Sequence, residues 1–291
     1  MQTVIENEHL SVVIDHFGAE LKSIKSKTDG TEYLWNADAR YWKRSAPVLF
    51  PFVGSVKDKC YMYEGQKYPM GQHGFARDNM FSLLSAEDNE AWFFLEDNEE
   101  TRKVYPFSFR LEIGYRIDAS SITVFWRVKN PMETELYYSI GGHPAFMCPV
   151  NGKGVQSDYS LVFDVGGKLV YSRLSENGLV ESKGHQLLLS GNRLKLSEHL
   201  FDDDALIFEG SQAHRIGLVD PDGRNVVTVS FDAPLFGLWS PAKKNAPFVC
   251  IEPWYGRCDA ESFEGTIAER EYGEQLPGGG TKEYSYVIEI G

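Results

Sequence analysis

The chain has 291 residues and a formal net charge of -13. This charge argues against nucleic-acid binding, which requires a basic surface to neutralise phosphates. The four cysteines are scattered without a CxxC pair, so neither a zinc site nor a disulfide framework is expected. No basic, apolar leader and no run of membrane-spanning length occurs, so we expect a cytoplasmic protein without a membrane partner.

The first eighty residues predict short strands separated by loops. Residues 11–15 and 19–25 form a predicted hairpin, and 38–42 a short helical turn. Residues 43–54 are apolar but carry two prolines, which a central strand does not tolerate. They therefore predict a buried loop or a bulged sheet edge. Residues 71–77 predict a loop that leads into a strand at 80–84.

The clearest predicted strands lie in the middle of the chain. Residues 107–117 and 122–128 alternate apolar and polar side chains, which is typical of a sheet with one face on the core. The polar residues between them predict a hairpin. A further strand at 135–140 is expected to end at Gly141-Gly142, because glycine allows the chain to turn there.

The second half predicts more strands, at 159–163, 186–189, 205–208, 215–220, 225–230, 235–240, 248–251 and 281–290. No amphipathic helix of three turns, no internal repeat and no low-complexity linker divides the chain. We therefore predict a single all-β domain over 1–291, a large antiparallel β-sandwich. Its acidic surface favours a monomer or a weak homodimer.

Two residues form a candidate acid/base pair. His143 follows the two glycines and is restricted by Pro144, and histidine exchanges protons near neutral pH. Glu252 is expected to end the apolar strand 248–251, and the aromatic Trp254 follows closely. Such a pair fits general acid/base catalysis, and the carboxylate should favour the protonated imidazole. Flat aromatic faces beside it suit a sugar ring.

Other interpretations stay open at this point. His143 could be a structural histidine in a tight corner, and Glu252 could be ion-paired with Arg44 or Arg77. His73, His143 and Glu252 could form a two-His-one-carboxylate metal site, although no local spacing requires a metal. No phosphate loop, GxSxG or HExxH motif occurs, and no cofactor is expected.

Four segments carry these side chains in order: Pro47-Val48-Leu49-Phe50-Pro51, His73-Gly74-Phe75-Ala76-Arg77, Gly142-His143-Pro144-Ala145-Phe146 and Glu252-Pro253-Trp254. In combination they resemble the aldose 1-epimerase, or galactose mutarotase-like, family, above all its LacX-like bacterial branch. The resemblance implies an antiparallel β-supersandwich with an open sugar cleft. It also implies interconversion of the α and β anomers of a hexose without a cofactor or a metal.

The resemblance further implies roles for individual residues. His143 would be the general acid at the ring oxygen, and Glu252 the base at the C1 hydroxyl. The implied substrate-binding set is Arg44, His73, Arg77, Asp204 and Trp254.

The family likeness leaves the substrate open. The His-Gly-Phe-Ala-Arg form at 73–77 is shared with relatives that act on hexose 6-phosphates, whereas galactose-specific members have a longer, Asn-rich histidine motif. The expected ligand is therefore a sugar or a sugar phosphate. Arg44 and Arg77 could clamp a phosphate if both point into the cleft. A non-catalytic carbohydrate-binding protein on the same fold is the competing hypothesis.

Overall fold

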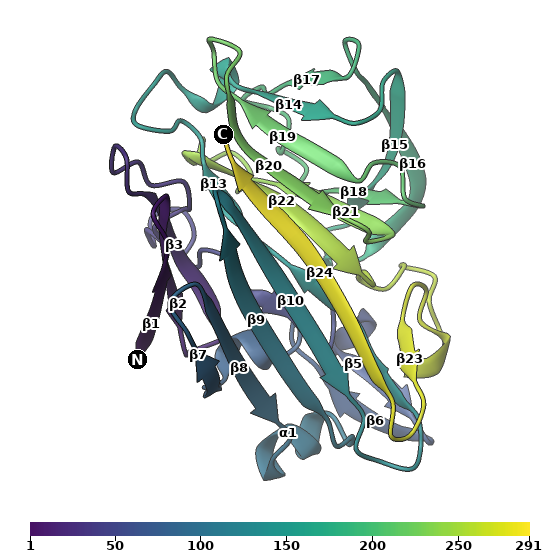
Figure 1. Cartoon of the computed structure of the whole chain (residues 1–291). Coiled ribbons are helices and arrows are strands. Elements are labelled where there is room, and N and C mark those ends of the chain that lie inside the picture. Colours follow the sequence, from purple (N-terminus) through teal and green to yellow (C-terminus); the bar gives the residue numbers. More distant parts are fainter.

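A computed structural model describes residues 1–291, and strands make up most of its regular structure. Two antiparallel sheets, of nine and eight strands, face each other across the main core (Figure 1). Three smaller sheets flank them. The prediction of an all-β fold with a large antiparallel sandwich is thus confirmed. No helix combines the length and the hydropathy that crossing a membrane would require.

The nine-stranded sheet contains, in order across it, β17 (Arg193–Lys195), β14 (Ser160–Phe163), β19 (Arg215–Val219), β20 (Asn225–Phe231), β24 (Thr281–Ile290), β10 (Ser121–Lys129), β9 (Arg110–Asp118), β8 (Glu90–Glu96) and β7 (Ser82–Ala86). The eight-stranded sheet contains β16 (Val180–Leu188), β15 (Lys168–Leu174), β18 (Leu206–Glu209), β21 (Leu235–Trp239), β22 (Phe248–Tyr255), β12 (Ile140–Gly142) and β4 (Val48–Leu49), and β13 (Ala145–Met147) also pairs with β22.

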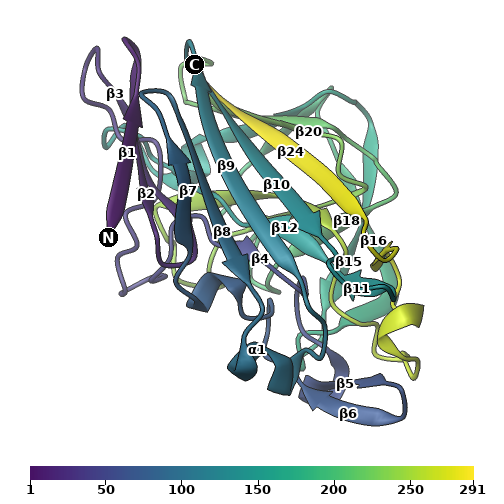
Figure 2. The same ribbon diagram turned by 60° about the horizontal axis from the view of Figure 1, so that its bottom comes forward.

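The smaller sheets are β1 (Gln2–Glu6), β2 (Leu10–Asp15) and β3 (Glu20–Ser26); β5 (Cys60–Tyr63) and β6 (Gln66–Pro69); and β11 (Leu136–Tyr138) and β23 (Glu274–Leu276). The helical segments are α1 (Glu99–Val104) and the 3-10 turns η1 (Lys57–Lys59), η2 (Ala76–Asp78), η3 (Gln156–Asp158) and η4 (Ile267–Glu269). α1 and the β5–β6 hairpin lie at the same end of the molecule (Figure 2).

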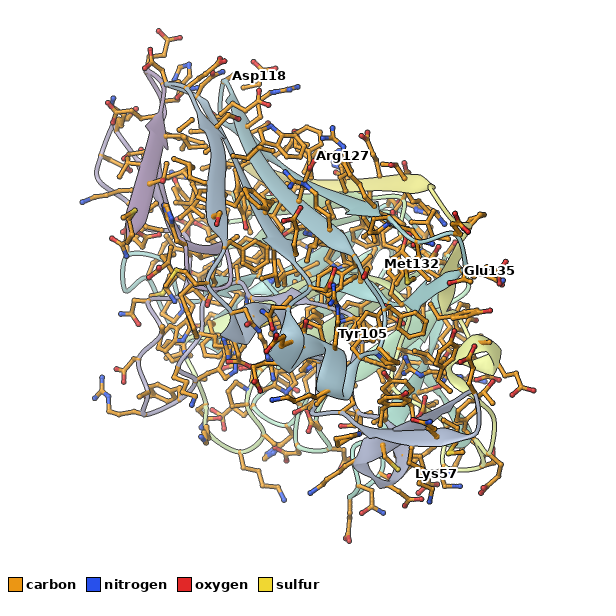
Figure 3. The ribbon with its side chains drawn as sticks, turned by 90° about the horizontal axis from the view of Figure 1, so that it is seen from below. Lys57, Tyr105, Asp118, Arg127, Met132 and Glu135 are labelled. Atoms are coloured by element: carbon orange, nitrogen blue, oxygen red, sulfur yellow. The ribbon has the colours of Figure 1, made fainter.

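The β9–β10 hairpin follows the predicted alternation closely. Asp118 pairs with Ser121 at its turn, and Trp126 and Ile113 are opposite each other on the core side. Figure 3 shows Asp118 at one end of this hairpin, with Met132 towards the opposite end. The first strand begins at Arg110 rather than at residue 107, although the aromatic side chains before it are buried.

The side chains of β22 alternate between two environments. Val249 and Ile251 pack in the main core between the large sheets, whereas Cys250, Glu252 and Trp254 face the other way. The eight-stranded sheet therefore has its core on one face. Its other face is free to carry a site.

Two strand boundaries differ from the predictions where candidate site residues lie. Residues 135–140 do not form one strand that turns at the glycines: β11 and β12 are separated at Ser139, and Gly141 and Gly142 both lie inside β12 without a positive φ. Glu252 does not end its strand either, because β22 continues to Tyr255. In both places pairing with neighbouring strands overrides the local sequence signal.

Pro253 lies inside β22 because the ladder has a gap there. The N–H of Ile251 donates to the Pro144 carbonyl at 3.4 Å, and backbone N–H groups two residues apart point the same way. Position 253 thus faces the corner between β13 and β12, where the chain leaves the ladder at His143. The missing N–H of proline therefore removes no ladder hydrogen bond.

Candidate active site

A cavity of about 530 Å³ lies on the face of the eight-stranded sheet that is turned away from the main core. It is lined by all seven residues that the sequence proposes for the site: Arg44, His73, Arg77, His143, Asp204, Glu252 and Trp254. These residues come from loops and strands far apart in the chain. The sheet and its edge loops bring them together.

His143 and Glu252 lie side by side in this cavity, both buried. Glu252 projects from the middle of β22, and His143 occupies the corner between β12 and β13, where its N–H donates to the Pro47 carbonyl at 3.1 Å. The His143 Nε2 and Glu252 Oε2 atoms are 3.3 Å apart but do not form a hydrogen bond. The other imidazole nitrogen, His143 Nδ1, is also buried without a hydrogen-bond partner. Glu252 is thus not ion-paired with Arg44 or Arg77.

Burial dominates the electrostatics of the pair. It raises the pKa of Glu252 well above its usual range, and the nearby Asp204 carboxylate adds to this rise. Burial, followed by the positive charge of Arg77, lowers the pKa of His143 to about 3. The expectation that the carboxylate would favour a protonated imidazole is therefore wrong for the empty cavity, where desolvation outweighs the attraction between the two groups. Both shifts favour a protonated Glu252 beside a neutral His143.

Aromatic rings enclose His143. The Trp42 ring lies over the imidazole, with centroids 4.7 Å apart and an angle of 30°, and Trp239 meets it edge-on at 5.2 Å. The indole N–H of Trp239 donates to Asp204 Oδ1 at 2.7 Å. Among the three acidic residues at 202–204, it is Asp204 that lines the cavity, whereas Asp203 pairs with Arg173.

Trp254 explains why glycines occur in the strands beside β22. A Cβ atom at Gly141 in β12 would lie 2.7 Å from its indole, and one at Gly237 in β21 only 2.5 Å. Both neighbouring strands therefore need glycine so that the indole can lie flat across them. The indole N–H of Trp254 is buried without a hydrogen-bond partner and is free to donate to a ligand.

His73 has a defined tautomer. Its Nδ1 accepts a hydrogen bond from the N–H of Gly54 at 3.0 Å, so the ring proton is on Nε2. Burial first, and then the charge of Arg77, lowers the pKa of His73 well below its usual range. His73 is therefore a neutral imidazole, 5.8 Å from the His143 ring between centroids, that offers one N–H.

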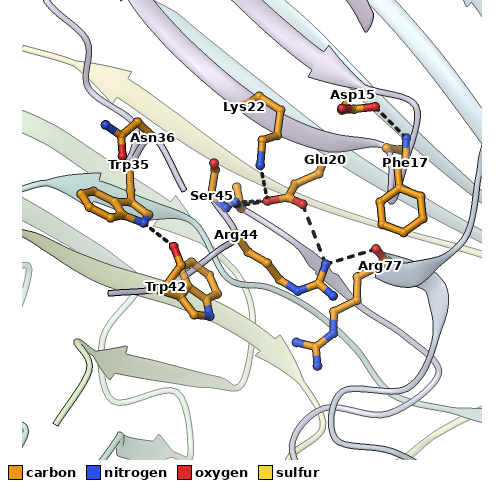
Figure 4. A network of polar contacts seen from close by, with 12 residues as sticks. Asp15, Phe17, Glu20, Lys22, Trp35, Asn36, Trp42, Arg44, Ser45 and Arg77 are labelled. Atoms are coloured by element: carbon orange, nitrogen blue, oxygen red, sulfur yellow. Dashed lines mark hydrogen bonds and ion pairs between the residues drawn. The ribbon is translucent and has the colours of Figure 1, made fainter. Parts of the chain in front are cut away.

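The two arginines differ in how their charges are balanced. Arg44 is bound by Asp78 and lies 4.0 Å from Glu20 Oε2, and it also donates to the Arg77 carbonyl at 3.3 Å (Figure 4). Arg77 donates to the Gln72 carbonyl at 2.9 Å, but its buried Nε has no hydrogen-bond partner and lies 3.8 Å from Asp78. Burial and then Arg44 lower the pKa of Arg77 to about 10, so it stays charged at neutral pH.

Metal-ligating atoms cluster around the pair in a different set from the predicted one. An imidazole nitrogen of His143, the sulfur of Cys250 and a carboxylate oxygen of Glu252 all lie within 4.8 Å of one another. His73 does not belong to this cluster. The two-His-one-carboxylate arrangement is therefore not what the fold assembles.

The family model described as aldose 1-epimerase matches residues 1–260. The chain belongs to the aldose 1-epimerase family. It is 34% identical over 279 residues to the plasmid and chromosomal forms of protein LacX from Lactococcus lactis subsp. lactis, with 92% of each chain covered. The resemblance to the LacX-like branch is thereby confirmed.

Solved structures of related proteins agree with this aldose 1-epimerase fold. The galactose mutarotase related enzyme from Lactobacillus acidophilus superposes with a TM-score of 0.95 at 33% identity, covering 100% of this chain and 97% of that one. A galactose mutarotase-like protein from Lactobacillus casei ATCC 334 gives 0.92 at 29% identity, with 100% of both chains covered. The sandwich fold is therefore shared by these proteins.

Reasoning from the sequence missed three residues that line this cavity, Trp42, Asp78 and Trp239, and it missed Cys250, which is buried beside the His143–Glu252 pair. Trp42 is the last residue of the predicted turn at 38–42, and Trp239 lies near the end of the predicted strand 235–240. An aromatic residue at a strand end or beside an arginine could have marked both. Asp78 and Cys250 carry no local signal, because their significance depends on partners far away in the chain.

Proposed function

We propose that the protein is a mutarotase that interconverts the α and β anomers of a hexose. The observation that carries the proposal is the His143–Glu252 pair, 3.3 Å apart and unshared with any cation, at an open cavity with aromatic walls. An unpartnered buried carboxylate is costly, so its presence in a cavity favours a chemical role.

The reaction needs one proton removed from the C1 hydroxyl and one delivered to the ring oxygen. The C1–O5 bond then breaks, the aldehyde rotates, and the ring closes on its other face with the protons returned. Glu252 takes the hydroxyl proton and His143 protonates the ring oxygen. The pair holds one proton before and after, so the cycle balances without a redox step.

Substrate binding supplies what the empty cavity lacks. A C1 hydroxyl that donates to Glu252 favours the carboxylate, and a ring oxygen that accepts from His143 favours the imidazolium. Both contacts move the proton from Glu252 to His143. The N–H groups of His73 and Trp254 and the Asp204 carboxylate hold sugar hydroxyls, while flat rings allow either anomer to bind.

A hexose 6-phosphate is the second candidate substrate. Arg77 and Lys43 line the cavity; Lys43 has no carboxylate partner and Arg77 only a distant one, Asp78 at 3.8 Å, whereas Arg44 is bound directly by Asp78. Arg77 with Lys43 is therefore the pair that we expect to attract a phosphate, with Arg44 held as a support.

Anomer exchange measured by NMR on glucose, galactose and glucose 6-phosphate tests the proposal. We expect faster exchange for at least one of these sugars, and for the phosphate we expect Arg77→Gln to raise KM far more than for the neutral sugars. Sugar binding without faster exchange, unaffected by Glu252→Gln, would instead identify a non-catalytic carbohydrate-binding protein.

A further inference from the structure

We propose that the base of the cavity takes a thiophilic divalent cation such as Zn²⁺ between His143, Cys250 and Glu252. Cys250 and Glu252 are alternate residues of β22 on the side turned away from the main core, with Cys250 packed beneath the cavity wall, and His143 meets them from the corner of β12 and β13. One donor atom from each lies within 4.8 Å of the others. Nitrogen, sulfur and carboxylate oxygen are the ligands that Zn²⁺ uses in proteins.

The donors fit such an ion after a small movement. Tetrahedral zinc places nitrogen, sulfur and oxygen ligands about 3.4 to 3.6 Å apart, so the longest separation must close by about 1 Å. Glu252 Oε2 and His143 Nδ1 are buried without hydrogen-bond partners, so binding breaks no contact at these atoms.

The thiol decides which cations bind. A thiolate ligand selects zinc and cadmium over magnesium and calcium, which prefer oxygen. Cys250 is fully buried, and metal binding releases two protons, one from its thiol and one from the His143–Glu252 pair. The cation is therefore expected to bind more tightly as the pH rises.

The consequence for catalysis rests on the proposed function. A cation held by His143 and Glu252 occupies the electron pairs that accept the sugar protons. Anomer exchange therefore stops while it is bound, and sugar and cation exclude each other. The cation acts as an inhibitor of the acid/base pair.

Cadmium titration tests the site directly, because a cadmium–thiolate bond has its own ultraviolet charge-transfer band. We expect a band that saturates at one ion per chain. Cys250→Ser should abolish it, whereas Cys258→Ser should keep it, since Cys258 is also buried in the cavity wall but lies outside the cluster. No band in the wild type, or a band that survives Cys250→Ser, would overturn the proposal.

Inhibition provides the second readout. Zn²⁺ should inhibit exchange in the wild type, and Cys250→Ser should exchange at the wild-type rate but need roughly 100-fold more Zn²⁺. Circular dichroism checks that Cys250→Ser is folded. If that variant does not fold, Cys250→Ala is used in its place. A cadmium band without any exchange activity would refute only the mutarotase proposal, and exchange without a band would refute only the metal site.

Discussion

Two glutamates, Glu112 and Glu252, are equally buried, each 1% exposed, but their surroundings are opposite. Glu112 lies on the outer side of β9 and is bound by Arg110, Arg127 and Lys129 at 2.6 to 2.7 Å. Burial acts to raise its pKa, but hydrogen bonds from Lys129, Arg110 and Arg127 outweigh this and hold the pKa at about 2. Glu252 has no cationic partner, and its pKa is raised.

The difference separates a structural carboxylate from a reactive one. Glu112 is held ionised by three cations, whose hydrogen bonds occupy three of its four or so lone-pair sites. Neither arginine of the cavity pairs with Glu252, and Asp78 and Glu20 neutralise Arg44. The fold thus leaves one buried carboxylate unsatisfied at a cost in stability, which is what a proton-transfer site requires.

The largest expected effect comes from removing the reactive carboxyl. Glu252→Gln should lower kcat by roughly 10²–10⁴, because the amide cannot accept the C1 proton. Its free energy of unfolding should stay the same or rise, since a neutral amide is less costly to bury than a carboxyl that ionises in the unfolded chain. Anomer exchange measures the change in kcat, and thermal unfolding measures the change in stability. Retained activity would show that Glu252 is not the base.

Glu112→Gln is the matched control and should do the opposite. It leaves three cations without their carboxylate, so we expect a loss of about 2 kcal/mol in stability, moderated because these cations are partly exposed to water. Exchange activity at a temperature well below unfolding should be unchanged. A large activity loss would mean that the outer face of the sheet also supports the site.

The same control has a pH dependence of known sign. Because the pKa of Glu112 is lowered on folding, its contribution is complete above the unfolded value of about 4.3 and is lost as the pH falls towards 2. The stability difference between wild type and Glu112→Gln should therefore shrink in acid. Denaturant unfolding at several pH values measures it.

The contrast also shows what a sequence can and cannot predict here. Alternation in β9, β10 and β24 predicted the sheets, because one buried face imposes a period of two. Glu252 and His143 were found because each has a proline beside it in an apolar setting. Their relative protonation was predicted wrongly, because it depends on how deeply both side chains are buried. The neighbouring residues in the sequence do not reveal that burial.

Glycines were misread for a similar reason. Gly141 was expected to provide a turn, yet it lies in a regular strand and provides space for Trp254 from the next strand. Such a requirement is set by a residue more than a hundred positions away. The role of Glu112 likewise depends on Lys129 and Arg127 across the hairpin, and only the register of β9 with β10 identifies them.

Glu20 is a third buried glutamate, and its removal should lower activity less than the removal of Glu252 does. Its Oε1 accepts from the backbone N–H groups of Ser45 and Ala46 at 2.5 and 3.1 Å, and so holds the loop whose Pro47 carbonyl binds His143 (Figure 4). Glu20→Ala should lower kcat/KM about tenfold, since an unpaired buried N–H costs about 1–2 kcal/mol. Glu20→Gln keeps one acceptor oxygen and should restore most of the activity. Equal losses in both variants would show that the charge, and not the loop, matters.

The smallest expected effect is that of pH on activity, and it distinguishes the buried pair from an ordinary one. With normal pKa values a Glu–His pair loses its shared proton above about 6.5, so activity would fall there. Here the His143 pKa of about 3 and the raised Glu252 pKa keep one proton on the pair across the whole interval between them. We therefore expect kcat/KM to show no inflection from His143 near pH 6.5, where ordinary histidines titrate, and to fall on the acid side only towards pH 3. Arg77→Gln removes the nearest cation, raises the pKa of His143 and should move the acid limb of the profile upward. A wild-type profile that falls through pH 6.5 would mean that His143 is solvated in the free enzyme, and the contrast with Glu112 would then rest on Glu252 alone.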